Sequence, residues 1–564
     1  MTDKKKPATK RASEKLTAPQ KAAAKTPPEP TAAAAKAAPT KARRPTAKAP
    51  AAKAAAKPAD DFNPPAVPVA KKISKRKRKV LKGMSDIRRY FYRNETPYYF
   101  ISGTNFNLMN MDEWVGNFHY ISYIDCFDKG HSKVFSPSEI PHDTFTGIED
   151  INNYLLSHKE TIDFVNKRGT KGNRGKAVFL MFDEKTEQIA QDLGLEVCFP
   201  PAALRSFVDD KINTTKLAER AGVKCVPNIL AKIESYEDLC KKSSKLGNNL
   251  VVQTAYGDSG HTTFFINNKR DFAKYAEEIT AEDRVKVMKR IRCRGSAQEA
   301  CVTRHGTIVG PLMTELVGFD ELTPYKGGWC GNEVFADSFS KKIRNEARKS
   351  TVAFGEELRK IGYRGYFEVD YLMDQDDGKV YLGEVNPRIT GASSMTNLAA
   401  FAHADAPLML FHLLEWADEV DFEIDVDALN ARWSDPENID SWSQLVMKHT
   451  YDTVDLFTDA PRTGVWGMKD DGTVEFLRPQ THRRTVSAEN EAFFLRISKP
   501  GDYRYEGCDL GILLTPGRLM TNDHSLTKRA KAWIAGLKAH YRTVPLNETP
   551  PEPQPVQIGS FKLL

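Results

Sequence analysis

The chain has 564 residues, of which 40% are hydrophobic and 28% charged, and its net charge is +8. This length has room for roughly three or four domains of ordinary size, and the apolar content is sufficient for folded cores. No apolar run approaches the ~18 residues that a membrane-spanning helix needs, so we expect no membrane partner.

The positive charge is concentrated at the N-terminus. Residues 1–83 contain 23 Lys and Arg but 5 Asp and Glu, so they carry +18 and leave about −10 for residues 84–564. Ala, Lys, Pro and Thr dominate this region and large apolar residues are nearly absent before Phe62, which predicts a disordered basic tail over residues 1–85. Such a tail would attract DNA, RNA or polyphosphate without reading sequence; a solubilising arm without a dedicated partner is the alternative.

The eight cysteines are scattered, without a CxxC pair or a histidine at zinc-finger spacing. The tail also lacks the apolar segment of a secretion signal. These features predict free thiols and a cytoplasmic location, with nucleoid association through the tail as a further option.

Residues 95–205 show alternating strand and helix patterns. Short apolar strands are expected at 98–101, 119–124 and 177–182, and a helix at 184–193. This alternation predicts a small open α/β domain.

A second folded region is expected over residues 206–415. A helix from Lys211 ends before Gly222, which is a good residue for a helix C-terminus. Strands are then predicted on both sides of a glycine-containing loop, Gly257-Asp-Ser259-Gly260, whose backbone N–H groups can line an anion site. Residues 325–333 are so rich in glycine that we expect a mobile loop near the substrate.

Two strands near residue 377 carry the most informative polar residues. The alternation in 366–372 puts Glu368 and Asp370 on one face, and Asp376-Asp377-Gly378 supplies the turn before a return strand. A hairpin symmetric about Asp377 places Asp370 opposite Glu384 and Glu368 opposite Asn386, and a slip of one residue would split this set. The same period predicts that Val380 and Leu382 share the face of Glu384 and Asn386.

Facing carboxylates repel each other unless a cation lies between them. Oxygen ligands of this kind suit Mg²⁺ or Mn²⁺. Arg388, two residues beyond Asn386, would then face an anionic phosphoryl or acyl group. The alternative is an acidic hairpin face that is simply solvated.

The segment Glu384-Val-Asn-Pro-Arg388 resembles the terminal metal-binding motif of the ATP-grasp superfamily. Residues 365–394 are especially similar to their counterpart in carbamoyl phosphate synthetase large subunits. The resemblance implies an α/β and α+β protein in which an ATP-grasp domain at 206–415 follows a pre-ATP-grasp domain at 95–205. By the same match, Asp370, Glu384 and Asn386 correspond to metal ligands and Arg388 to the arginine beside the transferred phosphoryl group.

The resemblance also implies a set of ATP-binding residues. Lys211 matches a lysine that reaches the phosphates, and Gln253 stands where a phosphate-binding lysine is usual. The further candidates lie in the loop over the triphosphate, at the adenine hinge and in the next strand: Gly257, Ser259, Gly260, Lys289 and Glu299.

Residues 416–545 predict an additional α+β domain, which is loosely similar to the C-terminal domain of biotin carboxylases. Short strands at 464–468, 473–477 and 492–497 precede a helix near 525–541. A proline-rich tail is expected at 546–564.

The resemblance implies a carboxylate–amine ligase that uses ATP with Mg²⁺ or Mn²⁺. A carboxylate would attack the γ-phosphate, and an amine would displace phosphate from the acyl phosphate. One alternative is an enzyme like biotin carboxylase or carbamoyl phosphate synthetase, although Arg388 is followed by Ile-Thr-Gly-Ala-Ser-Ser, without the glutamate base of biotin carboxylases. Another is a nucleotide-sensing, nucleic-acid-associated protein. A homodimer is also considered.

Overall fold

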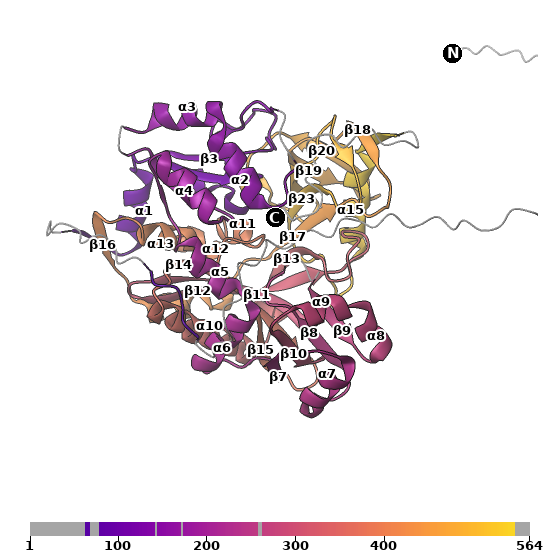
Figure 1. Ribbon diagram of the computed structural model, residues 1–564. Helices are drawn as coiled ribbons and strands as arrows, with labels where there is room; N and C mark the ends of the chain where they lie inside the picture. The colour runs from indigo at the N-terminus through magenta and orange to yellow at the C-terminus, as the bar shows by residue number, and fades with distance from the viewer. Residues whose placement is uncertain (1–61, 68–77, 141–143, 171–172, 258–261, 547–564) are drawn as a thin grey trace, which may run out of the picture. The chain divides into compact units, whose positions relative to one another are not determined.

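A computed structural model describes residues 62–67, 78–140, 144–170, 173–257 and 262–546 (Figure 1). By its internal contacts the chain divides into residues 1–56 and 57–564, and every element named below belongs to the second unit. The candidates Ser259 and Gly260, most of the predicted basic tail and most of the predicted C-terminal tail lie outside the described residues.

The first strand begins earlier than the predicted end of the tail. β1 (Lys79–Lys82) pairs in parallel with β16 (Val420–Glu423), and α1 (Met84–Tyr92) follows. Leu81 is buried, and the ring of Phe62 lies 5.2 Å from that of Phe207. The predicted boundary at residue 85 is therefore wrong, because isolated apolar residues among the basic ones find partners far along the chain.

A five-stranded parallel sheet follows, in the order β4-β3-β2-β5-β6. Its central strand, β2, is buried along its whole length, as expected for a parallel sheet covered on both faces. The strands are β2 (Tyr98–Ser102), β3 (Phe118–Ser122), β4 (Val134–Phe135), β5 (Gly175–Phe179) and β6 (Leu195–Val197), and the helices α2 (Ile148–Ser157), α3 (Lys159–Arg168) and α4 (Glu184–Asp192). The open α/β pattern is confirmed.

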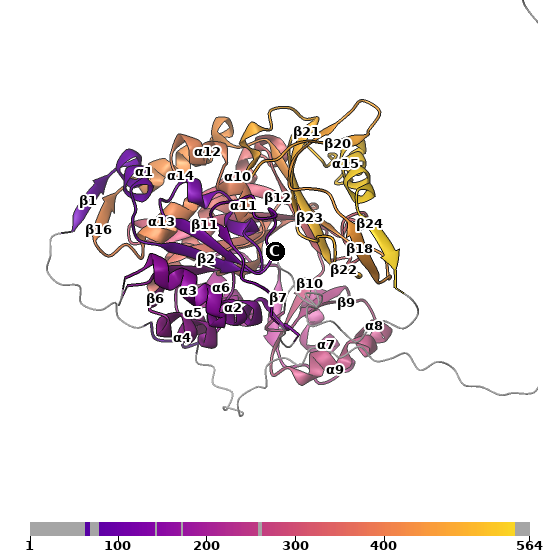
Figure 2. The ribbon, with the colours of Figure 1, turned by 90° about the horizontal axis from the view of Figure 1, so that it is seen from above.

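A four-stranded antiparallel sheet with the order β7-β10-β8-β9 comes next. Figure 2 shows α7, α8 and α9 beside it, and all three helices contribute to the core on one face of the sheet. The elements of this part are α5 (Ala202–Asp209), α6 (Lys211–Arg220), β7 (Asn228–Ala231), α7 (Tyr236–Lys242), β8 (Leu250–Gln253), β9 (Thr263–Ile266), α8 (Lys269–Lys274), α9 (Ala276–Ala281) and β10 (Val285–Lys289).

The largest sheet has ten strands in the order β15-β14-β11-β12-β13-β17-β23-β21-β19-β20. It crosses the predicted domain boundary at residue 415 without a break, because β13 pairs with β17. Helix α10 (Lys341–Lys360) packs on β11 and β12. The strands are β11 (Cys293–Thr303), β12 (Gly306–Val317), β13 (Trp329–Val334), β14 (Gly365–Asp374), β15 (Val380–Asn386), β17 (Trp442–Lys448), β19 (Gly464–Met468), β20 (Val474–Arg478), β21 (Glu491–Arg496) and β23 (Asp509–Pro516).

The loop predicted at 325–333 is wrong in its second half, which forms β13. Gly331 has φ +136°, and a Cβ atom there would lie 1.9 Å from the carbonyl oxygen of Gln444 in β17. The glycine therefore permits a close approach of two strands rather than a mobile loop.

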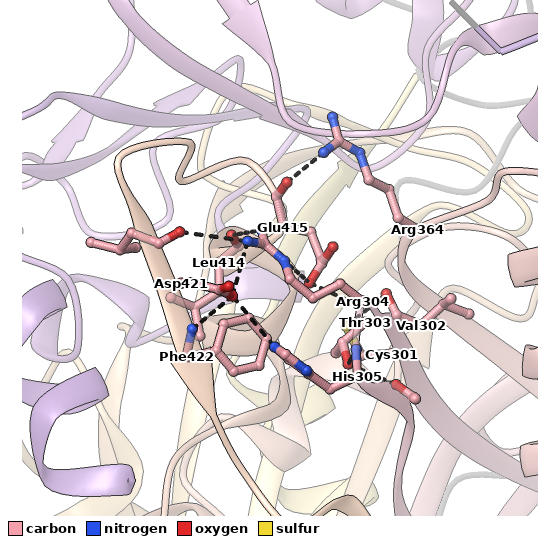
Figure 3. A network of polar contacts seen from close by, with 12 residues as sticks. Cys301, Val302, Thr303, Arg304, His305, Arg364, Leu414, Glu415, Asp421 and Phe422 are labelled. Atoms are coloured by element: carbon pink, nitrogen blue, oxygen red, sulfur yellow. Dashed lines mark hydrogen bonds and ion pairs between the residues drawn. The ribbon is translucent and has the colours of Figure 1, made fainter. Parts of the chain in front are cut away.

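The last segment before the C-terminal strands is a series of short helices: α11 (Ser393–Thr396), α12 (Ala400–Ala404), α13 (Leu408–Leu414) and α14 (Val426–Trp433). A polar network anchors it to the sheet (Figure 3). Arg304, at the β11–β12 turn, donates to Glu415 Oε1 from Nε at 3.3 Å and to Asp421 Oδ1 from a terminal nitrogen at 3.4 Å. Arg364, just before β14, donates to the Glu415 carbonyl. The network therefore holds the outer ends of β11 and β14.

The remaining elements complete the C-terminal part: β18 (Asp455–Asp459), β22 (Tyr503–Arg504) and β24 (Arg542–Pro545) form a small sheet near α15 (Lys528–Ala539). All eight cysteines are unpaired, as predicted. Among the described residues, no helix is both long and apolar enough to cross a bilayer.

Candidate functional site

The β14–β15 hairpin has the predicted register at its polar end. Glu368 lies opposite Asn386 and Asp370 opposite Glu384. The register then shifts by one residue, because Tyr371 pairs with Leu382 and Gly383 is left as a bulge.

This bulge overturns one detail of the sequence interpretation. Val380 and Leu382 were expected on the face of Glu384, but both belong to the core cluster that contains Val369 and Tyr371. The extra residue reverses the alternation, so Glu384 and Asn386 stay on the face of Asp370 while Val380 and Leu382 pack on the other.

Asn386 lies at the centre of the polar face. Its Nδ2 donates to Asp370 Oδ2 at 3.0 Å and to Glu368 Oε1 at 3.4 Å. Its Oδ1 accepts from a terminal nitrogen of Arg388 at 2.8 Å. The second oxygen of Asp370 is buried and has no hydrogen-bond partner among the described residues. The structure thus brings Asp370, Asn386 and Arg388 together.

The carboxylates of this face are poorly neutralised. Burial raises the pKa of Asp370 well above its usual value, and repulsion from Glu315, Glu368 and Glu384 adds to the effect. Burial and the negative charge of Glu299 raise the pKa of Glu368 to about 8. A cation bound among these oxygens would relieve this repulsion.

The donor set fits Mg²⁺ or Mn²⁺ in chemistry, since all its atoms are oxygens. In the described ranges, no three His, Cys, Asp or Glu side chains are placed to hold a metal ion. The predicted set therefore depends on the Asn386 oxygen, which accepts one hydrogen bond from Arg388 and keeps a second lone pair for a metal ion.

Lys211 joins this group from a helix start. Asp210 caps α6 by accepting from the backbone N–H groups of Ile212 and Asn213, which fixes Lys211 as the first helical residue. Its Nζ lies 3.3 Å from Glu384 Oε2 and donates to the Gly257 carbonyl at 2.9 Å. Three predicted residues from separate parts of the chain therefore meet.

Glu299 is held by hydroxyl groups in the interior of the protein. It is fully buried, pairs with Glu368 across β11 and β14, and accepts from Ser393 Oγ at 2.6 Å and Thr396 Oγ1 at 2.7 Å. Burial raises its pKa. The sequence interpretation missed Ser393 and Thr396, because a carboxylate partner ninety residues away leaves no local signal.

The other two nucleotide candidates differ in position. Gln253 ends β8 on the side of the sheet that faces the hairpin, and its Nε2 donates to Thr263 Oγ1 at 3.2 Å. Lys289 ends β10, is exposed, and alternates to the other side of the sheet from Met288. The structure does not bring Lys289 to the remaining candidates.

An apolar cluster next to the polar face was also missed. Val251 and Met288 of the four-stranded sheet pack against Val226 and against Tyr381 of the hairpin. The face shared by sheet and hairpin is thus apolar at one end and charged at the other, where Lys211 and Glu384 lie.

Comparison with known proteins identifies the architecture. No family model matches the chain. The crystal structure of the biotin carboxylase domain dimer of Hydrogenobacter thermophilus 2-oxoglutarate carboxylase, in complex with MgADP, ADP and bicarbonate, is 10% identical, with a TM-score of 0.52, and the match covers 81% of this chain and 92% of that one. The chain has the ATP-grasp fold. The predicted fold class is therefore confirmed.

Relatives of known activity match parts of the chain. A Niallia circulans [butirosin acyl-carrier protein]–L-glutamate ligase is 22% identical over 255 residues, which are 44% of this chain and 60% of the relative. The arginine-specific carbamoyl phosphate synthase large chain of Geobacillus stearothermophilus is 24% identical over 183 residues, which are 32% of this chain and 16% of the relative. The chain thus spans less than two thirds of either relative.

Proposed function

We propose that this protein is an ATP-dependent ligase that activates a carboxylate as an acyl phosphate for attack by an amine. One observation carries the proposal: the register of β14 and β15 places Asp370 opposite Glu384 and next to Asn386, with Lys211 and Arg388 beside them. The ligase activity named for the Niallia circulans relative supports the same class of reaction.

The cofactors proposed are ATP and Mg²⁺ or Mn²⁺. The metal would be held by Asp370, Glu384 and Asn386, and when bound it supplies positive charge against the phosphate oxygens. Gly257, whose carbonyl already accepts from Lys211, and Gln253 line the proposed phosphate end.

Arg388 and Lys211 are the protein's own cations for the reaction. A carboxylate oxygen of the substrate forms a bond to the γ-phosphorus while the bond to the β-phosphate oxygen breaks and ADP leaves. The amine then forms a bond to the carbonyl carbon, inorganic phosphate leaves, and the nitrogen loses a proton. Arg388 Nε is buried and has no partner among the described residues, so this side chain has a donor to spare for the transferred group.

The segment after Arg388 disfavours a biotin carboxylase. Thr390 donates to Glu368 at 2.7 Å, and Ser393 and Thr396 donate to Glu299. Hydroxyl groups thus occupy this segment, and it contributes no carboxylate that could act as a base.

The basic tail is proposed to bind nucleic acid or polyphosphate through residues 1–83. Its composition supports this, since Lys and Arg outnumber Asp and Glu by 23 to 5. Salt-dependent DNA binding of the full chain should exceed that of a chain starting at Met84, and equal binding by the two would contradict the proposal.

We also propose that the protein is a homodimer in the cytoplasm. Sedimentation of the full chain tests its oligomeric state.

Release of ADP in the presence of candidate acids and amines tests the ligase proposal. We expect ADP only when the correct acid and amine are both present, and none from the Asp370→Ala and Glu384→Ala variants. Asp377→Ala is the matched control, because it removes an exposed carboxylate from the turn of the same hairpin. Undiminished turnover in both site variants would refute the assignment.

A further inference from the structure

Lys286 is a buried cation without an anion of its own. The residue is the second of β10 and is fully buried. Its Nζ donates to the carbonyl oxygen of Gly383 at 3.3 Å, and it forms no ion pair with any described residue. An ammonium group has three N–H donors, so this environment leaves most of its hydrogen-bonding capacity unused.

Lys286 belongs to the face of the sheet that meets the hairpin. Val285 and Val287 point into the core of the four-stranded sheet, so Lys286 and Met288 lie on the opposite side. Lys286 is directly opposite Gln253 in the register of β10 and β8. Its single acceptor, Gly383, is the bulged residue of the β14–β15 hairpin next to Glu384.

The charges at this end of the face do not balance. Glu384 is the nearby carboxylate, and it already lies 3.3 Å from Lys211. Lys286 interacts electrostatically with both groups and with the thiol of Cys225, and burial lowers its pKa. Two ammonium groups therefore share one carboxylate. A buried charge without a partner is costly, so a retained one marks a place where an anion is expected.

We propose that Lys286 binds the phosphates of the nucleotide and supplies, from the neighbouring strand, the positive charge that Gln253 lacks. This inference rests on the proposed function, because it concerns the anionic end of the same site. The neutral amide of Gln253 is its direct cross-strand neighbour, so a cation at 286 is not repelled there.

Binding measurements on the full chain test this assignment. Two ligands, ADP with Mg²⁺ and adenosine, are titrated calorimetrically into the wild type, Lys286→Met and Lys274→Met. Lys274→Met is the control, because it removes an exposed lysine from α8, which packs on the same four-stranded sheet. We expect Lys286→Met to weaken ADP binding by about tenfold or more and to leave adenosine binding unchanged, since a charge-assisted contact to phosphate is lost. Lys274→Met should match the wild type for both ligands.

The result separates two failures. If the wild type binds ADP and Lys286→Met binds it equally well, the role of Lys286 is refuted and the proposed function stands. If the wild type binds no ADP, both are refuted.

Thermal unfolding without nucleotide tests whether Lys286 has a purely structural role. Removing an unpaired buried charge should leave the midpoint of Lys286→Met unchanged or higher, while the shift on adding ADP becomes smaller. A lysine needed only for packing would instead lower the midpoint of the nucleotide-free protein, and that outcome would overturn the inference.

Exchanging the residues at 253 and 286 tests whether the positive charge itself is needed for ADP binding. Lys286→Gln should lose ADP affinity as Lys286→Met does, and Gln253→Lys added to Lys286→Gln should recover most of it, because the cation returns to the adjacent strand. A double variant that binds ADP no better than Lys286→Gln would count against a role for this charge.

Discussion

Two parts of the ten-stranded sheet differ in whether their buried charged side chains have a counter-charge. One part contains β17 and β23, and the other is the β14–β15 hairpin. Toward the C-terminal end of the sheet, Lys448 of β17 pairs with Asp509 of β23, and both are buried. Glu333 of β13 accepts from the backbone N–H groups of Leu519 and Met520. Lys448 and Asp509 thus neutralise each other, and one oxygen of Glu333 is bound by backbone donors while its second oxygen has no partner among the described residues.

At the other end Asn386 donates to Glu368 and Asp370, but neither carboxylate forms an ion pair with a described residue. Glu368 and Asp370 lie close to further carboxylates, and Lys286 of the adjacent four-stranded sheet donates to a carbonyl group and forms no ion pair with a described residue. Buried charge alone therefore does not indicate function. A charge neutralised by the protein holds the structure together, whereas a buried charge of either sign without a counter-charge marks where a ligand is expected to bind.

The largest effect is expected when a carboxylate of the β14–β15 hairpin is removed. Asp370→Asn should reduce ligase turnover by roughly 10²–10³-fold, because a proposed metal ligand is lost. The unfolding midpoint without ligand should stay equal or rise, since one repelling carboxylate has gone. Steady-state ADP release and thermal unfolding measure the two effects, and a lower midpoint together with full turnover would contradict the assignment.

Removing a buried charge from β17 should lower the stability of the fold. Lys448→Met leaves Asp509 buried without its partner and should destabilise the fold by about 3–5 kcal/mol. Denaturant unfolding measures this loss. Replacing both partners, as in Lys448→Met with Asp509→Leu, should recover much of it, and a lone Lys448→Met without effect would show that the pair is not structural.

Removal of Lys211 tests the proposed phosphate end. Lys211→Met should weaken binding of ADP with Mg²⁺ by about tenfold, because the ammonium beside Glu384 is lost. Calorimetric titration measures the change. Lys216→Met, on the same helix, is the matched control and should bind ADP as the wild type does.

The smallest expected effect is a pH dependence of stability caused by Glu368. The folded-state pKa of Glu368 is raised to about 8, above the ~4.3 of an unfolded glutamate, by burial and by Glu299 and Glu315, against the opposing charge of Arg388. Its contribution to stability is therefore greatest below pH 4 and is lost as pH rises toward 8. The midpoint of the nucleotide-free wild type should fall between pH 5 and 8 by more than that of Glu368→Gln. Equal slopes would show that Glu368 does not titrate in this range.

Local pattern determined much of the site. The alternation in residues 366–372 and the turn at Asp377 were sufficient to place Asp370 opposite Glu384, because a period of two and a symmetric turn leave few registers for a hairpin. The helix that starts at Lys211 was equally predictable, since Asp210 is a strong capping residue directly before it. The ATP-grasp fold followed from the motif that these residues belong to.

Only the tertiary structure decided the rest. The bulge at Gly383, the close approach at Gly331 and the burial of Glu299 against Ser393 all depend on segments that are distant in sequence. Lys286 is the clearest case, because its neighbours Gln253 and Gly383 come from two other strands. Periodicity says which side of a strand a residue is on, but the charge that it faces is set by long-range packing, which a local pattern does not contain.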